Sequence, residues 1–329
     1  MKRNLLLFIT LLIVFFLSVQ PASSQAGPGG VGDLTNTQLW LRADKGIFVI
    51  GASSVIMWTD QSGHGRAFIP VVDGQNVPNR TMNALNGLPV VTFNDTGGVD
   101  GEFLGYEGDL GFSGSDASTV FIVARNTTAA DEQNGGLYIG EKNVGGAGQV
   151  RNYSLEYKDA VRFNGENQIF SDGHTNGNWR IIAYSNPSGA AVSAYRAWLS
   201  GTALTGGSAS MNVPSLVANY TLLGATQNGG TFNSQGYIDG DIAEVVVYSN
   251  ELNDASRIVV ENHMGAKYNV AISDDHYAYQ TTHSVDVSGI AAYNGTTFTN
   301  GRSSNILSIN SPTDLSDNEY LFYGHHNGT

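Results

Sequence analysis

Three carboxylates lie close together in the segment Asp239-Gly-Asp241-Ile-Ala-Glu244. A retaining glycosidase uses two carboxyl groups about 5–5.5 Å apart, one as nucleophile and one as general acid and base. Side chains alternate along a strand, so Asp239 and Asp241 would share one face, and Glu244 would lie on the other unless a β-bulge intervenes. The simpler alternative is that Asp239 begins a turn into the strand and that Glu244 is structural. The segment is an alternative catalytic site without a firm catalytic residue.

Aspartates in glycine-rich segments are a second kind of candidate, because carboxylate, amide and carbonyl oxygens bind calcium. The candidates for calcium are Asp60, Asp95 and Asp100, and Asp109 and Asp116 lie in similar segments. No segment follows the EF-hand spacing, so a calcium site would have to be assembled across loops. Each of these aspartates can also stabilise its own turn by bonding to nearby backbone.

Aromatic side chains are a third kind of candidate functional residue, because the apolar faces of sugar rings pack on aromatic surfaces. Trp40, Trp58, Trp179 and Trp198 all lie in strand-like patterns, where a large ring usually belongs to the core. We expect loop positions to be better placed to bind a ligand, and the weak candidates there are Tyr106, Phe112 and Tyr138. The sequence contains no G-x-S-x-G, H-E-x-x-H or P-loop motif.

The composition narrows the class of partner. The formal net charge of −13, without a basic stripe, argues against a nucleic-acid partner. The chain has no cysteine, which excludes disulfides, thiol catalysis and cysteine-ligated metals. A chain of 329 residues can bury a sufficient core without disulfides. Its 41 glycines and 14% charged residues are typical of many short strands joined by tight turns.

The N-terminal segment predicts export. Lys2 and Arg3 precede an unbroken apolar run, Leu5 to Leu17, and small residues follow it up to Ala26. This is the pattern of a secretory signal peptide over residues 1–26, and the run is shorter than the roughly 20 residues that span a bilayer. We therefore expect a secreted or cell-surface protein, with no membrane span in the mature chain.

The elements that would position these residues are mostly strands. Leu39 and Leu41 alternate with Trp40 and Arg42, which is a pattern of period two. Similar short apolar runs, each closed by turn residues, recur at 55–58, 89–93, 119–124, 179–184, 194–199, 220–224 and 241–248. One helix is predicted over residues 254–268, with Asn253 as its N-cap. The pattern predicts an all-β, two-sheet antiparallel sandwich with one C-terminal helix.

Three blocks carry a resemblance to a known family: residues 39–46, residues 58–65, and residues 239–257 running on to Tyr268. Together they resemble the LamG-like jelly-roll domains of the concanavalin A-like lectin/glucanase superfamily, as found in secreted and surface proteins of Bacteroidetes. In those domains a strand of the form G-x-I-A-E-V-x-x-Y precedes a helix that ends in Lys-Tyr. The match covers about residues 33 to 270.

The resemblance implies a jelly-roll domain over residues 27–272, followed at 273–329 by the start of a second, truncated β unit. It implies a non-catalytic carbohydrate-binding or adhesion module for a glycan or cell-surface polysaccharide, assisted by Ca²⁺ in some members. The superfamily also contains hydrolases of O-glycosyl compounds, so a glycoside hydrolase that uses Asp239, Asp241 or Glu244 is the alternative. Its glucanases carry Glu at the first acidic position of the motif, where this chain has Asp239.

Overall fold

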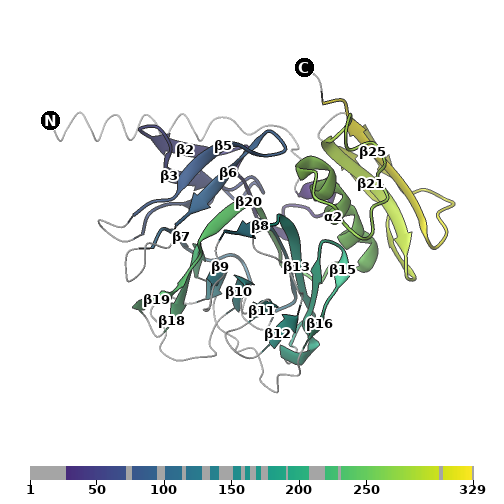
Figure 1. The fold of residues 1–329 in the computed structure, drawn as a ribbon. Helices are drawn as coiled ribbons and strands as arrows, with labels where there is room; N and C mark the ends of the chain where they lie inside the picture. Colours follow the sequence, from purple (N-terminus) through teal and green to yellow (C-terminus); the bar gives the residue numbers. More distant parts are fainter. Residues whose placement is uncertain are drawn as a thin grey trace.

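Two antiparallel sheets face each other over a shared apolar core in this computed structural model (Figure 1). The structure describes residues 27–71, 76–94, 101–112, 116–127, 134–140, 151–156, 160–163, 168–171, 177–189, 192–206, 219–228, 231–303 and 307–327. Strands dominate this part of the chain, which contains a single α-helix, α2 (Asp254–Tyr268), and two short 3-10 helices, η1 (Pro28–Gly30) and η2 (Val192–Ala194). The predicted all-β sandwich with one helix is confirmed.

The larger sheet has the order β15-β14-β13-β8-β20-β6-β5-β3-β2, with β1 beside β20 and β4 beside β3. Its strands are β1 (Thr37–Arg42), β2 (Ile47–Ile50), β3 (Ser54–Thr59), β4 (Ala67–Phe68), β5 (Asn79–Leu85), β6 (Leu88–Phe93), β8 (Ser118–Asn126), β13 (Arg180–Asn186), β14 (Arg196–Leu199), β15 (Thr202–Ala203) and β20 (Gly240–Tyr248).

The smaller sheet has the order β16-β12-β11-β10-β9-β17-β7, and a separate hairpin, β18–β19, lies beside it. The strands are β7 (Leu104–Glu107), β9 (Asn134–Gly140), β10 (Arg151–Glu156), β11 (Ala160–Phe163), β12 (Gln168–Ser171), β16 (Thr205–Gly206), β17 (Tyr220–Leu223), β18 (Ala225–Asn228) and β19 (Thr231–Tyr237).

Strand β20 is buried along its whole length because both faces of the larger sheet are covered there. Val245 and Val247 point into the core between the sheets, whereas Val246 and Tyr248 point toward α2. Complete burial of each such apolar side chain contributes about 1.5–3 kcal/mol relative to exposure. The helix is thus a third layer on the sandwich, and β20 positions its own side chains in two different environments.

Helix α2 has the boundaries that the sequence predicts. The Asn253 side chain accepts a hydrogen bond from Ser256 N at 2.8 Å, which satisfies one of the free N–H groups of the first turn. Asn269 ends the helix in the left-handed conformation, at φ 51° and ψ 42°. Val259 and Met264 face the larger sheet within its outer apolar cluster. None of the helices in the described residues is long and apolar enough to cross a membrane.

The residues after 273 form a small β unit that packs on the other side of α2 (Figure 1). One sheet has the order β22-β21-β25, and a hairpin, β23–β24, packs against β21. The strands are β21 (Val285–Tyr293), β22 (Thr296–Phe298), β23 (Asn300–Ser303), β24 (Leu307–Asn310) and β25 (Glu319–His325). Polar contacts help to fix this unit; among them, Ser288 Oγ donates to Gly29 O at 2.5 Å, and His263 Nδ1 lies 2.7 Å from Val287 O.

Candidate functional site

The acidic segment 239–244 lies in β20 and at its entrance, and the carboxylates of Asp241 and Glu244 have internal partners. Asp241 is 3% exposed, and it accepts hydrogen bonds from Arg125 Nε at 2.7 Å and from Thr92 Oγ1 at 2.5 Å. Asp239 lies half-buried just before the strand, where its backbone oxygen accepts a hydrogen bond from Thr127 N. Asp241 therefore ties β20 to its two neighbours, β6 and β8.

A β-bulge decides where Glu244 points. The register of β20 against β8 shifts between Ile242 and Glu244, at the place where the other neighbour of β20 changes from β6 to β1. The extra residue turns Glu244 toward α2, on the same side as Ala243. The bulge that could bring the carboxylates to one face does exist, but that face is covered by the helix.

Glu244 is completely buried and is held by three donors. Trp40 Nε1 lies 2.6 Å from its Oε1, and Lys267 Nζ and the Tyr268 hydroxyl each lie 2.7 Å from its Oε2. Lys267 Nζ also lies 3.1 Å from Asp44 Oδ1, and Asp44 Oδ2 pairs with Arg42 at 2.6 Å. The cluster holds two carboxylates and two cations, so its formal charge is balanced.

The balance of charges in the cluster keeps the carboxyl groups of Glu244 and Asp44 ionised. Burial alone would raise the pKa of Glu244, yet Lys267 and Arg42 hold it below its ordinary value. The same opposition applies at Asp44, where Lys267 and Arg42 outweigh burial and lower the pKa. A general acid needs a raised pKa and access to substrate, and Glu244 has neither. Glu244 is therefore unsuited to the general-acid role that the glycosidase alternative gives it.

The three blocks of the resemblance meet at this cluster. Trp40, Arg42 and Asp44 come from the first block, and Glu244, Lys267 and Tyr268 come from the third. The second block joins them through the Trp58 indole, which donates to Arg42 O at 3.0 Å, and through Asp60, whose Oδ1 accepts from Trp40 N at 2.9 Å. The shared pattern is an internal lock between the sandwich and its helix.

Asp60 is consequently a poor calcium ligand. Its Oδ1 also accepts from Ser62 N at 2.8 Å, and its Oδ2 accepts from Ser62 Oγ at 2.6 Å. Asp95 and Asp100 lie outside the described residues. Asp109 accepts from Gly111 N at 2.6 Å, as a turn aspartate does. Within the described ranges no three Asp, Glu or His side chains gather where they could hold a metal ion. The calcium assignment of Asp95 and Asp100 stays a prediction.

The expected loop position is wrong for Tyr106 and Tyr138, which lie in strands, whereas Phe112 lies outside the strands as expected. Tyr138 lies in β9 and is buried on the outer face of the smaller sheet, where its ring meets Tyr220 edge-on at 6.4 Å. The cause is the strand period, because Leu137 and Ile139 point inward to the core. Phe112 is also buried in that core. Tyr106 lies half-buried in β7, with its ring 5.9 Å from that of Phe68.

An open groove of about 770 Å³ lies where the sandwich, the N-terminal end of α2 and the small β unit meet. We call it the α2 groove. One wall is the turn after η1, shaped by Asp33, whose Oδ1 accepts from Thr35 N at 2.8 Å and from Asn36 N at 2.9 Å. The facing wall is the β23–β24 hairpin, in which Asn300 and Asn310 pair across the strands.

Close backbone packing holds these two walls together. Gly30 has φ +77°, and a Cβ added there would lie 2.4 Å from Arg302 O. Only glycine permits this approach of η1 to β23 without strain. The groove width therefore depends on one position that carries no side chain.

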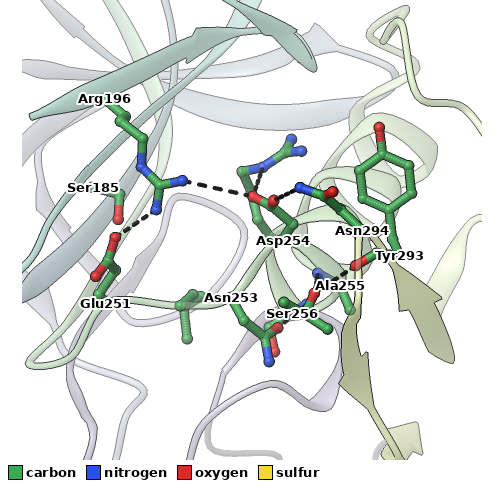
Figure 2. A network of polar contacts seen from close by, with 12 residues as sticks. Ser185, Arg196, Glu251, Asn253, Asp254, Ala255, Ser256, Tyr293 and Asn294 are labelled. Atoms are coloured by element: carbon green, nitrogen blue, oxygen red, sulfur yellow. Dashed lines mark hydrogen bonds and ion pairs between the residues drawn. The ribbon is translucent and has the colours of Figure 1, made fainter. Parts of the chain in front are cut away.

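A polar network fixes the helix end beside the groove (Figure 2). Figure 2 shows Asp254 between Arg196 and Asn294, whose Nδ2 donates to Asp254 Oδ2 at 3.1 Å. Arg196 also pairs with Glu251 at 2.5 Å. At the next residue of the helix, the Ala255 N–H donates to Thr296 Oγ1 at 3.1 Å, so the helix start is bonded to the β21–β22 hairpin.

A second arginine lies deeper in the same region. The Arg257 guanidinium lies 4.8 Å from the centroid of the Trp198 ring and donates to Glu261. Glu261 is fully buried, and its Oε1 has no hydrogen-bond partner among the described residues. Burial raises the pKa of Glu261 to about 7, although Arg257 opposes the shift.

Neutral polar groups and one aromatic ring line the α2 groove; they include Asn36, Asn250, Ser256, Phe298, Asn300 and Asn310. Ser256 is only 7% exposed, and the described contacts include no hydrogen bond of its hydroxyl. Asp33 and Arg302 contribute one carboxylate and one guanidinium, so neither sign dominates. Sequence reasoning missed this site, because its residues come from four separate segments without a motif.

No protein-family model matches the chain, and no curated protein is similar to it in sequence. Solved structures do show similarity. A Trypanosoma rangeli sialidase in complex with sialic acid is 14% identical, with a TM-score of 0.45, over 74% of this chain and 35% of that one. Domain 4 of AbnA, a GH43 extracellular arabinanase from Geobacillus stearothermophilus, in complex with arabinotriose, is 12% identical, with a TM-score of 0.46, over 68% and 97%.

The binding domain of Paraclostridial Mosquitocidal Protein 1 is 11% identical, with a TM-score of 0.41, over 69% of this chain and 51% of that one. The chain thus spans about a third of the sialidase and about half of the toxin domain. These TM-scores lie below 0.5, and the fold assignment rests on the chain's own two sheets and core. The LamG-like assignment stays a prediction.

Proposed function

We propose that this chain is a non-catalytic binding module that recognises a glycan in the α2 groove. The observation that carries the proposal is the groove itself, a hollow of about 770 Å³ lined by amides, a hydroxyl without a partner and a phenyl ring. Binding sites are usually concave, with apolar surface and a few convergent polar groups. Glu244 serves the internal lock instead, and Asp241 ties β20 to β6 and β8.

The chemistry of the lining favours a sugar over a charged ligand. Each sugar hydroxyl both donates and accepts hydrogen bonds, and a side-chain amide does the same through its N–H₂ and its oxygen. Asn300 and Asn310 place two such amides side by side on the hairpin wall. The half-buried Phe298 ring supplies an apolar surface for the C–H face of a sugar. One acidic and one basic residue leave the groove without a dominant charge.

The proposal includes a location outside the cell. Its support is the signal-peptide pattern over residues 1–26, which lies outside the described residues. The absence of cysteine fits an oxidising environment, because no thiol is exposed to unwanted pairing. A secreted module would meet polysaccharides or glycosylated surfaces there.

The test is a printed array of plant, microbial and mammalian oligosaccharides, followed by calorimetry with the best-bound array glycan. We expect Phe298→Ala to weaken binding about tenfold, since loss of about 1.4 kcal/mol of ring contact corresponds to that factor. Tyr279→Ala is the matched control, because Tyr279 is an exposed ring outside the groove and its loss should leave binding unchanged.

Each assay is run with calcium and with a chelator. Equal binding in both is expected, because the groove lining contains a single carboxylate, Asp33. Failure of the wild-type chain to bind any array glycan, or equal binding by the Phe298→Ala variant, would refute the proposal. Binding that disappears with the chelator would move the site away from the α2 groove.

A further inference from the structure

Strand β25 (Glu319–His325) forms a free edge of the small β unit. Among the described residues it pairs only with β21, so the backbone N–H and C=O groups on its other side have no strand partner. Such a row of unpaired groups is a template for another strand, and proteins usually protect it. The pairing with β21 contains a bulge, but its extra residue lies on β21, where Asp286 has φ +48°. β25 itself is regular.

Several other sheet edges among the described residues are protected. β15 and β16 have two residues each, and β7 is covered by a bridge between Ile69 and Gly105. The edge strand β2 has a register shift between Phe48 and Val49, which interrupts flat pairing. β25 has none of these features, and its sequence Glu-Tyr-Leu-Phe-Tyr-Gly-His contains no lysine, arginine or proline.

The side chains of β25 alternate between a face toward α2 and a face toward the β23–β24 hairpin, where the Tyr323 hydroxyl donates to Leu307 O at 3.4 Å. Tyr320 and Phe322 pack toward the apolar cluster around α2. Leu321 points to the opposite face and is 50% exposed. Leu307, on the neighbouring hairpin, is 46% exposed. An unprotected regular edge therefore carries an exposed leucine at its centre.

We propose that β25 pairs antiparallel with β25 of a second copy of this chain, which joins two three-stranded sheets into one of six strands. The strand is complementary to itself when the two-fold axis passes beside Phe322. Glu319 of one copy then lies opposite His325 of the other, so the only acidic residue of the strand meets its only imidazole. Leu321 lies opposite Tyr323, so the exposed leucine of one copy meets the half-buried aromatic ring of the other on the same face.

The experiment is sedimentation velocity of the purified chain from about 1 to about 100 µM, since a homodimer depends on concentration. The wild-type chain should shift from monomer to dimer within this range. Leu321→Lys places a charge on the free edge and should leave the chain monomeric throughout. Leu307→Lys is the matched control, because it adds the same charge to a similarly exposed leucine that is not on β25. Circular dichroism of each variant checks that the fold is kept.

The register is tested by charge reversal. Glu319→Lys should weaken the dimer at least tenfold, and adding His325→Glu to the same chain should restore it. A wild-type chain that stays monomeric over the whole concentration range overturns the proposal. The partner of the β25 edge would then have to be a strand of a different protein. A dimer that survives Leu321→Lys places the interface elsewhere and also overturns it. None of these outcomes bears on glycan binding, which uses other residues.

Discussion

At the C-terminal end of α2, Lys267 and Tyr268 complete a buried cluster in which every charge has a partner, whereas at the N-terminal end Ser256 borders an open groove with its hydroxyl unused. Glu244, one of the catalytic candidates of the sequence, lies in the buried cluster at the C-terminal end of α2, which we call the closed end. The open end is built from common amides and a serine. The comparison teaches that acidic residues at a regular spacing indicate a function only if solvent can reach them.

The largest effect is expected from a substitution in the buried cluster at the closed end of α2. Glu244→Gln leaves Lys267 buried with Asp44 as its only carboxylate, so we expect a loss of about 3 kcal/mol in the free energy of unfolding. Urea denaturation measures it. Glu251→Gln is the control, because its pair with Arg196 is partly exposed and should be worth less than about 1 kcal/mol. A loss below 1 kcal/mol for Glu244→Gln would mean that the cluster is not a lock.

A second prediction uses the pH dependence of stability to compare buried Glu261, whose pKa is raised, with Glu244 and Asp44, whose pKa values are lowered. The pKa of Glu261 is raised to about 7 in the fold, above its ordinary 4.5, so the folded state binds a proton that the unfolded state releases. Stability is then fully present below about pH 4.5 and falls as the pH rises through about 7, by roughly 3 kcal/mol in all. Glu244 and Asp44 act in the opposite sense, because their lowered pKa values weaken the fold on acidification.

Urea denaturation between pH 3.5 and 8 tests this pH dependence. The decline above pH 4.5 should disappear in Glu261→Gln, while the acid limb should remain. Glu251→Gln again serves as the control, since the pKa of Glu261 does not depend on that residue. An unchanged slope in Glu261→Gln would assign the decline to another group.

The third prediction concerns the groove walls. Gly30→Ala forces a side chain against the Arg302 backbone at positive φ, so we expect a loss of about 1–3 kcal/mol together with weaker glycan binding. Gly51→Ala is the matched control, because Gly51 has φ +63° with open space around its missing Cβ. It should show only the backbone strain, about 1 kcal/mol, and normal binding. Equal effects of both variants would show that the close approach at Gly30 does not set the groove.

The smallest effects are expected from substitutions of two asparagines near the α2 groove, Asn253 and Asn300. Asn253→Ala removes the N-cap and should cost about 1 kcal/mol of stability, visible as a lower midpoint in thermal unfolding. Asn300→Ala, on the exposed hairpin wall, should change stability by less than about 0.5 kcal/mol but weaken glycan binding. If the two variants behaved alike in both assays, the separation between scaffold and binding surface would be lost.

Much of the fold could be predicted from the sequence, because local patterns determine it. The alternation of Leu39 and Leu41 with Trp40 and Arg42 predicts a strand, and the structure buries it on both faces. Asn253 followed by helical spacing gives the bounds of α2. Tyr138 was misplaced because the glycines around it resemble a loop, whereas the strand between them buries it.

The candidate site could not be predicted in the same way. The bulge between Ile242 and Glu244 depends on which neighbouring strand β20 meets, and this is a property of the sheet rather than of the segment. The α2 groove joins residues near 30 and 250 with residues near 300. Their proximity follows from the packing of the small β unit on α2, a long-range contact that no local pattern records.

The bulge in β20 has a consequence for changes in chain length. Deleting Ala243 would remove the bulge and leave Glu244 on the side of α2, because Glu244 would then directly follow the inward-pointing Ile242. A residue inserted between Glu244 and Val245 would instead turn Val245 and Val247 out of the core between the sheets. β20 should therefore tolerate the loss of Ala243 better than the gain of a residue after Glu244.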